Sequence, residues 1–298
     1  MFDVYLVNYL LKKNIISNQQ YRTISKVQRS SRVKLGLIAV SKKLLTNEQA
    51  EEINFIQGSQ DKLFGDIAIE LGYLTVNQVG KLLVLQSNSY LKLAQTLVDY
   101  NMCSLSDFET YVKAYQQDNA YTDQEMEYLK SDDITCMLPI LLKIDVSTYL
   151  ELISLTIRNI IRFIDTQVFV DHCYITKRYH AESISCQEVT GDHTIFLGFS
   201  GKRLSLLSIA NPYAAEDMTS VTIEAFDAVC EFINCINGLF ATKLSMEQIA
   251  LELLPPTFNT NLEITSEEIY VVPLIINNEA VDLIVSIDHD ICIQKKGD

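Results

Sequence analysis

The sequence predicts an α+β protein: an all-α N-terminal part is followed by a part in which two long helices pack on a largely antiparallel sheet. Three observations predict it. A helical pattern recurs every 29 residues over the first 118 residues, apolar segments alternate with turn signals after residue 166, and residues 222–243 form one long, mostly apolar helix. A length of 298 residues also favours two domains.

The charge of the chain is unevenly distributed. The net charge is −14, and residues 1–118 hold 13 of the 24 basic residues but only 11 of the 38 acidic ones. The strongly acidic remainder would repel nucleic acid, so no nucleic-acid binding is expected. No apolar run approaches the roughly 18 residues of a membrane span, so no membrane insertion is expected either.

The seven cysteines include no C-x-x-C pair, which favours reduced thiols and a cytoplasmic location. At the N-terminus Asp3 precedes the apolar stretch and the lysines follow it, so we expect no signal peptide.

The 29-residue pattern pairs an apolar helix with a second helix that starts at a Ser or Thr. In each unit a Gln or Asp follows three residues after this N-cap, as in a capping box. The N-cap positions in register are Ser17, Thr46, Thr75 and Ser104. The clearest match is between residues 34–57 and 63–86, and such small units are stable only when stacked. Residues 1–118 are therefore predicted to be a helical repeat domain.

Residues 119–136 are polar and acidic and are predicted to be a linker, within which a short helix can form. The second domain spans residues 137–298. Residues 137–142 contain Pro139 and are predicted to be a strand or loop. Asp145-Val146-Ser147 is predicted to cap a helix that runs to about residue 164.

The remaining elements follow from alternation and turn residues. Strands are predicted near 167–176, 181–189, 193–199, 203–209, 246–254, 262–276 and 280–287. Gly191-Asp192 and Asn277-Asn278 are the turn signals between neighbouring strands. The long helix 222–243 lies between the two groups of strands.

This helix carries a narrow polar stripe. Asp227, Glu231 and Asn234 fall at positions i, i+4 and i+7, with Gly238 one turn further on the same side. Glycine costs about 1 kcal/mol inside a helix, and Asn is also a poor helix former. One interpretation is that the stripe is merely the solvent-facing side of the helix, and the other is that it is a functional site.

Other chemistries have little support in the sequence. The four histidines match no metal-ligand pattern, so no metal site is predicted. Gly198-Phe199-Ser200-Gly201-Lys202 lacks the final glycine of a nucleophile elbow, and there is no Walker phosphate loop.

The stripe resembles the signature of the CheC, CheX and FliY phosphatases of bacterial chemotaxis, which act on phosphorylated CheY-type receivers. The matching residues are Asp227, Glu231 and Asn234, with Pro255 and Pro256 about twenty residues later. Asn237-Gly238 stands where CheX-like proteins tend to carry a glycine. On the preceding helix Glu151 is followed by Ser154 where CheC-type proteins have a second Asn, so one active motif is predicted, as in CheX.

The resemblance implies a phosphatase for the aspartyl phosphate of a CheY-like receiver. Glu231 and Asn234 would be the catalytic residues: Glu231 would pair with a receiver lysine, and Asn234 would orient the attacking water. Asp227, Asn237 and Gly238 would contact the receiver, which itself carries the Mg²⁺, so no other cofactor is expected. CheX-like proteins pair through their sheets, which implies a homodimer. The alternative is a non-catalytic adaptor that binds receivers.

The N-terminal units resemble the tandem motif of the N-terminal domain of GspE/MshE-type secretion ATPases, which binds cyclic di-GMP in some members. Lys34 and Leu63 occupy the arginine position of that motif, and lysine cannot supply the planar fork of arginine. A docking module is therefore favoured. Cyclic di-GMP binding is the alternative, at Lys34, Gly36, Gln57, Gly65 and Gln86.

Overall fold

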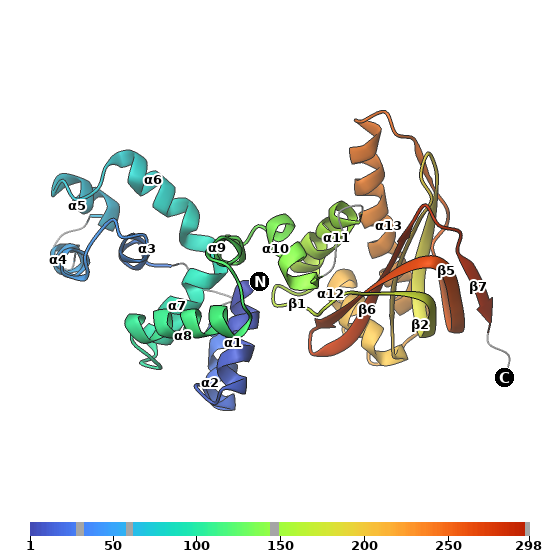
Figure 1. Cartoon of the computed structure of the whole chain (residues 1–298), viewed down its shortest axis with the longest axis horizontal. Helices are drawn as coiled ribbons and strands as arrows, with labels where there is room; N and C mark the ends of the chain where they lie inside the picture. Colours follow the sequence, from blue (N-terminus) through green and yellow to red (C-terminus); the bar gives the residue numbers. More distant parts are fainter. Residues whose placement is uncertain (28–32, 58–61, 144–148, 296–298) are drawn as a thin grey trace. The chain divides into compact units, whose positions relative to one another are not determined.

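Helices make up all the regular structure described for the first 132 residues, whereas the rest of the chain combines helices with a sheet (Figure 1). The computed structural model describes residues 1–27, 33–57, 62–143 and 149–295. Within them the chain forms two units, Met1–Asp132 and Asp133–Asp298. The predicted α+β class is confirmed. The boundary lies inside the predicted linker 119–136, which also contains helix α9.

The N-terminal unit consists of short helices. They are α1 (Phe2–Lys12), α2 (Asn18–Val27), α3 (Leu35–Ser41), α4 (Asn47–Gln57), α5 (Phe64–Glu70), α6 (Val76–Val84), the 3-10 turn η1 (Leu85–Ser87), α7 (Ser89–Asp99), α8 (Leu105–Asp118) and α9 (Asp123–Lys130).

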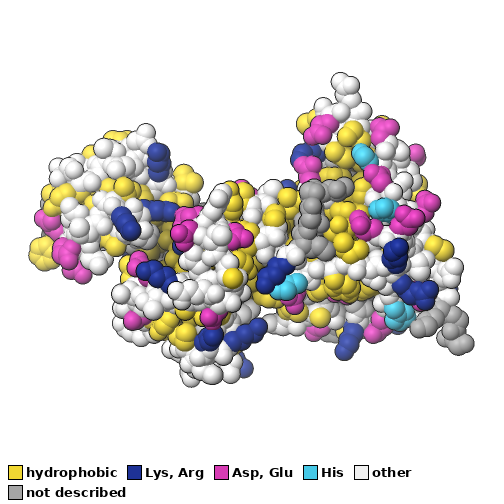
Figure 2. All heavy atoms as spheres, in the orientation of Figure 1, with side chains coloured by type: hydrophobic (Ala, Val, Ile, Leu, Met, Phe, Trp, Pro, Cys, Tyr) yellow, Lys and Arg dark blue, Asp and Glu magenta, His cyan; other side chains and the backbone are white. Residues whose placement is uncertain are grey.

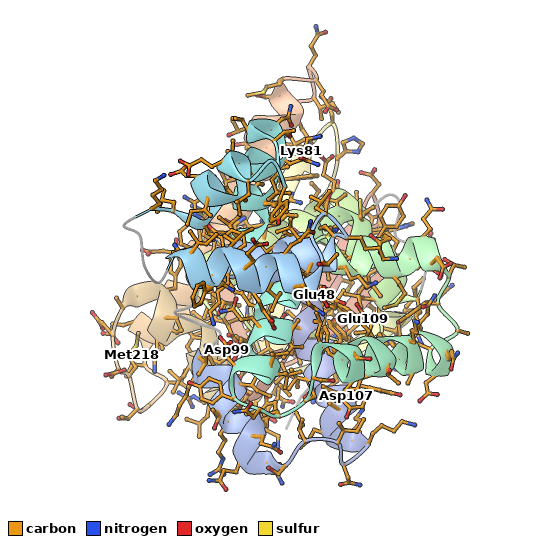
Figure 3. The ribbon with its side chains drawn as sticks, turned by 90° about the vertical axis from the view of Figure 1, so that its left-hand side faces the viewer. Glu48, Lys81, Asp99, Asp107, Glu109 and Met218 are labelled. Carbon is orange, nitrogen blue, oxygen red and sulfur yellow. The ribbon has the colours of Figure 1, made fainter. Side chains whose placement is uncertain are left out.

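The same turn precedes each of the four predicted N-caps, Ser17, Thr46, Thr75 and Ser104. One residue of each turn is left-handed, with φ of 56°, 56°, 72° and 51° at Asn14, Lys43, Gly72 and Asn101. In each case the next helix begins shortly afterwards with the expected cap. The side chains of Gln20, Gln49, Gln78 and Asp107 accept the backbone N–H of the N-cap residue three positions earlier, at 2.8–3.0 Å. Figure 3 labels Asp107 at the start of α8. These bonds satisfy donors that a helix start leaves without a partner.

The C-terminal unit begins with two helices and continues into strands. Its elements are α10 (Ile134–Leu142), α11 (Leu150–Phe163), β1 (Phe169–Val170), β2 (Tyr174–Gly191), β3 (Ile195–Gly201), the 3-10 turn η2 (Arg203–Leu206), α12 (Leu207–Ala214), α13 (Ile223–Ser245), β4 (Leu251–Leu253), β5 (Thr257–Ile276), β6 (Glu279–Ile287) and β7 (Cys292–Lys295).

All strand pairings described in this unit are antiparallel. The order is β1-β5-β6-β3-β2-β4, and β7 pairs with β5. The long strands β2 and β5 also pair with each other, so β2, β3, β6 and β5 are hydrogen-bonded in a ring. An apolar cluster contributed by these four strands fills it, including Ile184, Phe196, Ile264 and Ile284. Helix α13 packs against β2, β3, β4 and β5 of the sheet, and α12 packs against α13 (Figure 1).

Several predicted elements differ from the structure. Residues 203–209, predicted to be a strand, form η2 and the start of α12, because Leu206 and Ile209 share one buried helical face. Residues 137–142 lie in helix α10 despite Pro139, since the burial of its apolar side chains outweighs one lost hydrogen bond. The predicted strand 246–254 is reduced to β4, and β7 has no counterpart among the predicted strands. The predicted cap at 145–147 lies outside the described residues.

Across the described ranges, no helix is long and apolar enough to cross a membrane.

Candidate functional site

Helix α13 holds the candidate site because three of its sides are buried and one is not. Its 23 residues start after Thr222, whose side chain hydrogen-bonds Glu224 and lowers the pKa of that carboxyl. The buried faces pack on the sheet and on α12, and the ring of Phe232 lies between Phe199 and Tyr213, with centroids 5.8 and 5.1 Å away. Packing of this kind fixes the rotation of the helix about its axis.

The polar stripe lies on the remaining side. Asp227, Glu231 and Asn234 are exposed, and Gly238 is half-buried. Neither carboxylate has an ion-pair partner within the described residues. At the C-terminal end of the helix, Lys243 forms an ion pair with Glu151 of α11. Glu151 therefore connects α11 to α13.

The side-chain amide of Asn234 is held by a residue that the sequence did not single out. Gln187 of β2 is 2% exposed, and its Nε2 donates to Asn234 Oδ1 at 2.7 Å and to the backbone carbonyl of Leu254 at 2.8 Å. Its Oε1 accepts from Asn237 Nδ2 at 2.9 Å. The only sequence signal for Gln187 is a long polar side chain at a buried strand position, which does not identify its partners.

The sequence predicts that Asn237 contacts the receiver, but in the structure Asn237 is buried. Its side chain is 2% exposed and donates to Gln187, because position 237 lies a quarter-turn away from the stripe, on the side that faces β2. A residue buried in this way cannot touch a partner protein directly. We therefore place Asn237 among the residues that support the site.

Gly238 has no packing reason to be a glycine. A Cβ at this position would meet no heavy atom within 4 Å. The helix consequently bears the destabilisation of glycine without any gain inside the unit. An open position beside Asn234 is what close approach by another molecule requires.

Apolar side chains border the stripe on both sides. Phe258 of β5, 38% exposed, stacks on Phe226 with ring centroids 4.3 Å apart and planes at 5°. On α13 itself Leu239 is 47% exposed. Tyr213 of α12 lies near Glu231 and Cys235, and burial, followed by these two neighbours, raises the pKa of its phenol. The polar stripe, with its two carboxylates and one amide, therefore has apolar side chains on both sides.

The prolines predicted to accompany the motif follow the residue that anchors Gln187. The carbonyl that accepts from Gln187 belongs to Leu254, directly before Pro255 and Pro256. Leu254 is itself paired to β2 through its N–H, which donates to Glu188 O at 3.0 Å. The proline segment is thus connected to Asn234 through one glutamine.

Each residue predicted to bind a nucleotide in the N-terminal unit either bonds to another residue of the chain or packs closely against one. Lys34 Nζ pairs with Asp99 at 3.0 Å (Asp99 is labelled in Figure 3). A Cβ on Gly36 would lie 3.1 Å from the Phe64 ring, and one on Gly65 would lie 2.8 Å from Val79. These glycines permit close helix packing.

The two glutamines of that prediction also bond to the chain itself. Gln57 Nε2 donates to the carbonyl of Lys62 at 3.1 Å, and Gln86 Nε2 donates to that of Val33 at 2.8 Å. Contacts within the chain thus account for the presence of all five residues without a bound nucleotide. Cyclic di-GMP binding remains a prediction.

The part of the chain that the structure describes contains no group of three or more His, Cys, Asp or Glu residues placed to hold a metal ion.

Comparison with known proteins finds a family match within the C-terminal unit. Residues 183–275 match the family model described as "Chemotaxis phosphatase CheX", a segment that contains the whole stripe together with Gln187 and the prolines. No curated protein matches the chain.

Several solved structures are similar to this chain at low identity. A chemotaxis protein CheX from Desulfovibrio desulfuricans is 12% identical, with 50% of this chain and 100% of that chain covered and a TM-score of 0.39. CheX from Vibrio vulnificus is 10% identical, with 48% and 99% covered and a TM-score of 0.40. A Borrelia burgdorferi structure, described as a CheX-CheY-BeF3-Mg+2 complex, is 16% identical, with 47% and 97% covered and a TM-score of 0.33.

Proposed function

We propose that the C-terminal unit accelerates hydrolysis of the aspartyl phosphate of a CheY-like receiver. The observation that carries the proposal is the pair of exposed side chains one turn apart on α13, Glu231 and Asn234, within the segment that matches the CheX family model. The carboxylate has no ion-pair partner among the described residues, and the amide is held in one orientation.

The reaction needs little chemistry from this chain. A water attacks phosphorus, the bond between phosphorus and the aspartyl oxygen breaks, and the products are a carboxylate and inorganic phosphate. The receiver would supply the acyl phosphate, the Mg²⁺ and a lysine. Positioning of the water and compensation of charge account for most catalysis in such a transfer. Asn234 would orient the water, and Glu231 would pair with the receiver's lysine.

The surroundings of the pair suit a protein partner better than a small molecule. The exposed rings and aliphatic side chains at Phe258 and Leu239 provide apolar contact area beside the charged strip. Gly238 leaves room for the partner to approach the helix backbone next to Asn234. Asp227 would extend the acidic edge toward basic groups of the receiver.

The direct test is the lifetime of receiver phosphate. Receivers from the same host are phosphorylated with a small-molecule phosphodonor, the donor is removed, and the remaining phosphoprotein is followed with and without this protein. A shortened lifetime at less than one equivalent of the protein is expected, because a catalyst turns over. Binding to the receivers without any shortening would support the adaptor instead.

Glu231→Ala is expected to weaken receiver binding about three- to tenfold at low salt, because an exposed carboxylate contributes roughly 1 kcal/mol to a charge pair. The loss should shrink as salt is raised, since exposed charges are screened. Titration of a labelled, phosphate-analogue-loaded receiver measures it. The matched control is Glu247→Ala, an exposed acid beyond the end of α13. Equal affinities for both variants would contradict the role of Glu231.

We also propose that the N-terminal unit is a docking or regulatory module. Large apolar side chains are exposed on α4, on α6 and just before α5, and Figure 2 shows hydrophobic side chains at the surface in this part of the unit. They are Phe55, Leu63, Val76, Leu83 and Val84. Exposed apolar side chains of this kind suit protein contact.

Deleting residues 1–132 should not change how fast the remaining C-terminal unit dephosphorylates a freely diffusing receiver. The lifetime assay described above measures this rate.

A further inference from the structure

Gln187 occupies a position that is costly to fill with a polar side chain. It lies on β2, almost fully buried beneath α13, where an apolar residue would need no partners. Instead its amide makes three hydrogen bonds, to a backbone carbonyl and to two side chains of α13. Burying an amide costs free energy unless its polar atoms are hydrogen-bonded, and these bonds offset that cost for Gln187.

The three bonds leave the network only one arrangement. The carbonyl of Leu254 can only accept, so it must face the NH2 group of Gln187 rather than its oxygen. The second N–H of that group then requires an acceptor, which fixes Oδ1 of Asn234 on the inner side. The oxygen of Gln187 correspondingly receives the NH2 group of Asn237. The orientation of Asn234 is therefore set by a backbone atom, through one glutamine.

The exposed half of the Asn234 amide is consequently its NH2 group. The side-chain torsion that turns an asparagine amide is soft, so without a partner the oxygen and the nitrogen would exchange places. An anionic acyl phosphate is attracted by N–H donors and repelled by a carbonyl oxygen. Holding the oxygen inward removes the unfavourable orientation before a receiver arrives.

We propose that Gln187 is a positioning residue: it keeps the NH2 group of Asn234 turned outward, toward the receiver's acyl phosphate and the attacking water. The inference rests on the proposed phosphatase function. Gln187 touches neither the receiver nor the water, and it acts only through Asn234. Asn237 supports it from the opposite side by holding its oxygen.

The test compares Gln187→Met, which keeps the length of the side chain and removes all three bonds, with the matched control Gln294→Met on the exposed strand β7. We expect Gln187→Met to lower the maximal dephosphorylation rate about tenfold, the effect of one lost orienting hydrogen bond. The concentration of phosphatase at half-maximal rate should not change. Gln294→Met should match the parent. A raised half-maximal concentration with an unchanged maximal rate would overturn the proposal.

A double-mutant cycle isolates the path through Asn234. In an Asn234→Ala background, Gln187→Met should cause no further loss, because nothing is left to orient. An additional tenfold loss in that background would overturn the proposal. If the parent protein does not shorten the lifetime of receiver phosphate, the proposed function itself fails, and if Asn234→Ala keeps the parent's acceleration, the catalytic assignment of Asn234 fails. Full loss in Asn234→Ala with none in Gln187→Met removes only the positioning role.

Nuclear magnetic resonance of the parent protein keeps the proposal testable should Gln187→Met not fold. The side-chain NH2 protons of Gln187 should show Overhauser contacts to the β-protons of Asn234, and the Asn234 NH2 pair, identified by its loss in Asn234→Ala, should give two well-separated resonances. Where Gln187→Met does fold, this pair should shift. Absence of the contacts in the parent would overturn the inference.

Discussion

Asn234→Ala is expected to remove the acceleration of receiver dephosphorylation, a loss on the order of 100-fold or more, which is typical of deleting one preorganised donor at a reacting group. Receiver binding should stay within about twofold of the parent, because Glu231 and the apolar border remain. Single-turnover decay of a phosphorylated receiver at saturating phosphatase gives the rate, and a titration gives the affinity.

Asn234→Asp sharpens this experiment. The carboxylate has the same shape and can still accept from Gln187 Nε2, but it places a negative oxygen where the amide has N–H donors. We expect a loss at least as large as in Asn234→Ala, whereas Glu247→Ala should have the parent's rate. Retention of more than half of the parent's rate in both Asn234 variants would refute the catalytic assignment.

Gly191→Ala is expected to destabilise the C-terminal unit strongly, although it adds only one methyl group. Gly191 ends β2 with φ of +129°, and a Cβ would lie 2.3 Å from the backbone oxygen of Ala250. That oxygen also accepts the N–H of Asp192 at 2.9 Å, so it cannot move without breaking the join between β2 and β4. Strain and displacement together should cost about 3 kcal/mol.

Thermal unfolding followed by circular dichroism measures this effect, and the C-terminal unit should melt about 10 °C lower. Gly238→Ala is the matched control, for which we expect a change in stability of the opposite sign. Its Cβ would meet no atom in the unit, so gaining a better helix former should raise stability by up to about 1 kcal/mol. A Gly191→Ala melting temperature within 2 °C or so of the parent would contradict the packing argument.

Local patterns are sufficient to predict some elements and not others. The predicted helix 222–243 corresponds to α13, and Asn277 and Asn278 do form a left-handed turn, with φ of 49° and 69°, between β5 and β6. Residues 203–209 are ambiguous because their leucines and Ile209 fit either period over so short a stretch. The full length of β2 and β5 does not follow from local patterns, since their pairing with each other depends on residues far apart in the chain.

The alignment of Asp227, Glu231 and Asn234 on one side of a helix follows from the amino-acid order alone, because the helical repeat places residues four and three apart in a line. The direction in which the amide of Asn234 faces, and the burial of Asn237, are set by the folded chain. Both depend on Gln187, which is 47 residues away in the sequence and is brought under α13 by the register of β2. A hydrogen bond between such distant residues follows from strand pairing and helix packing, which no local pattern encodes.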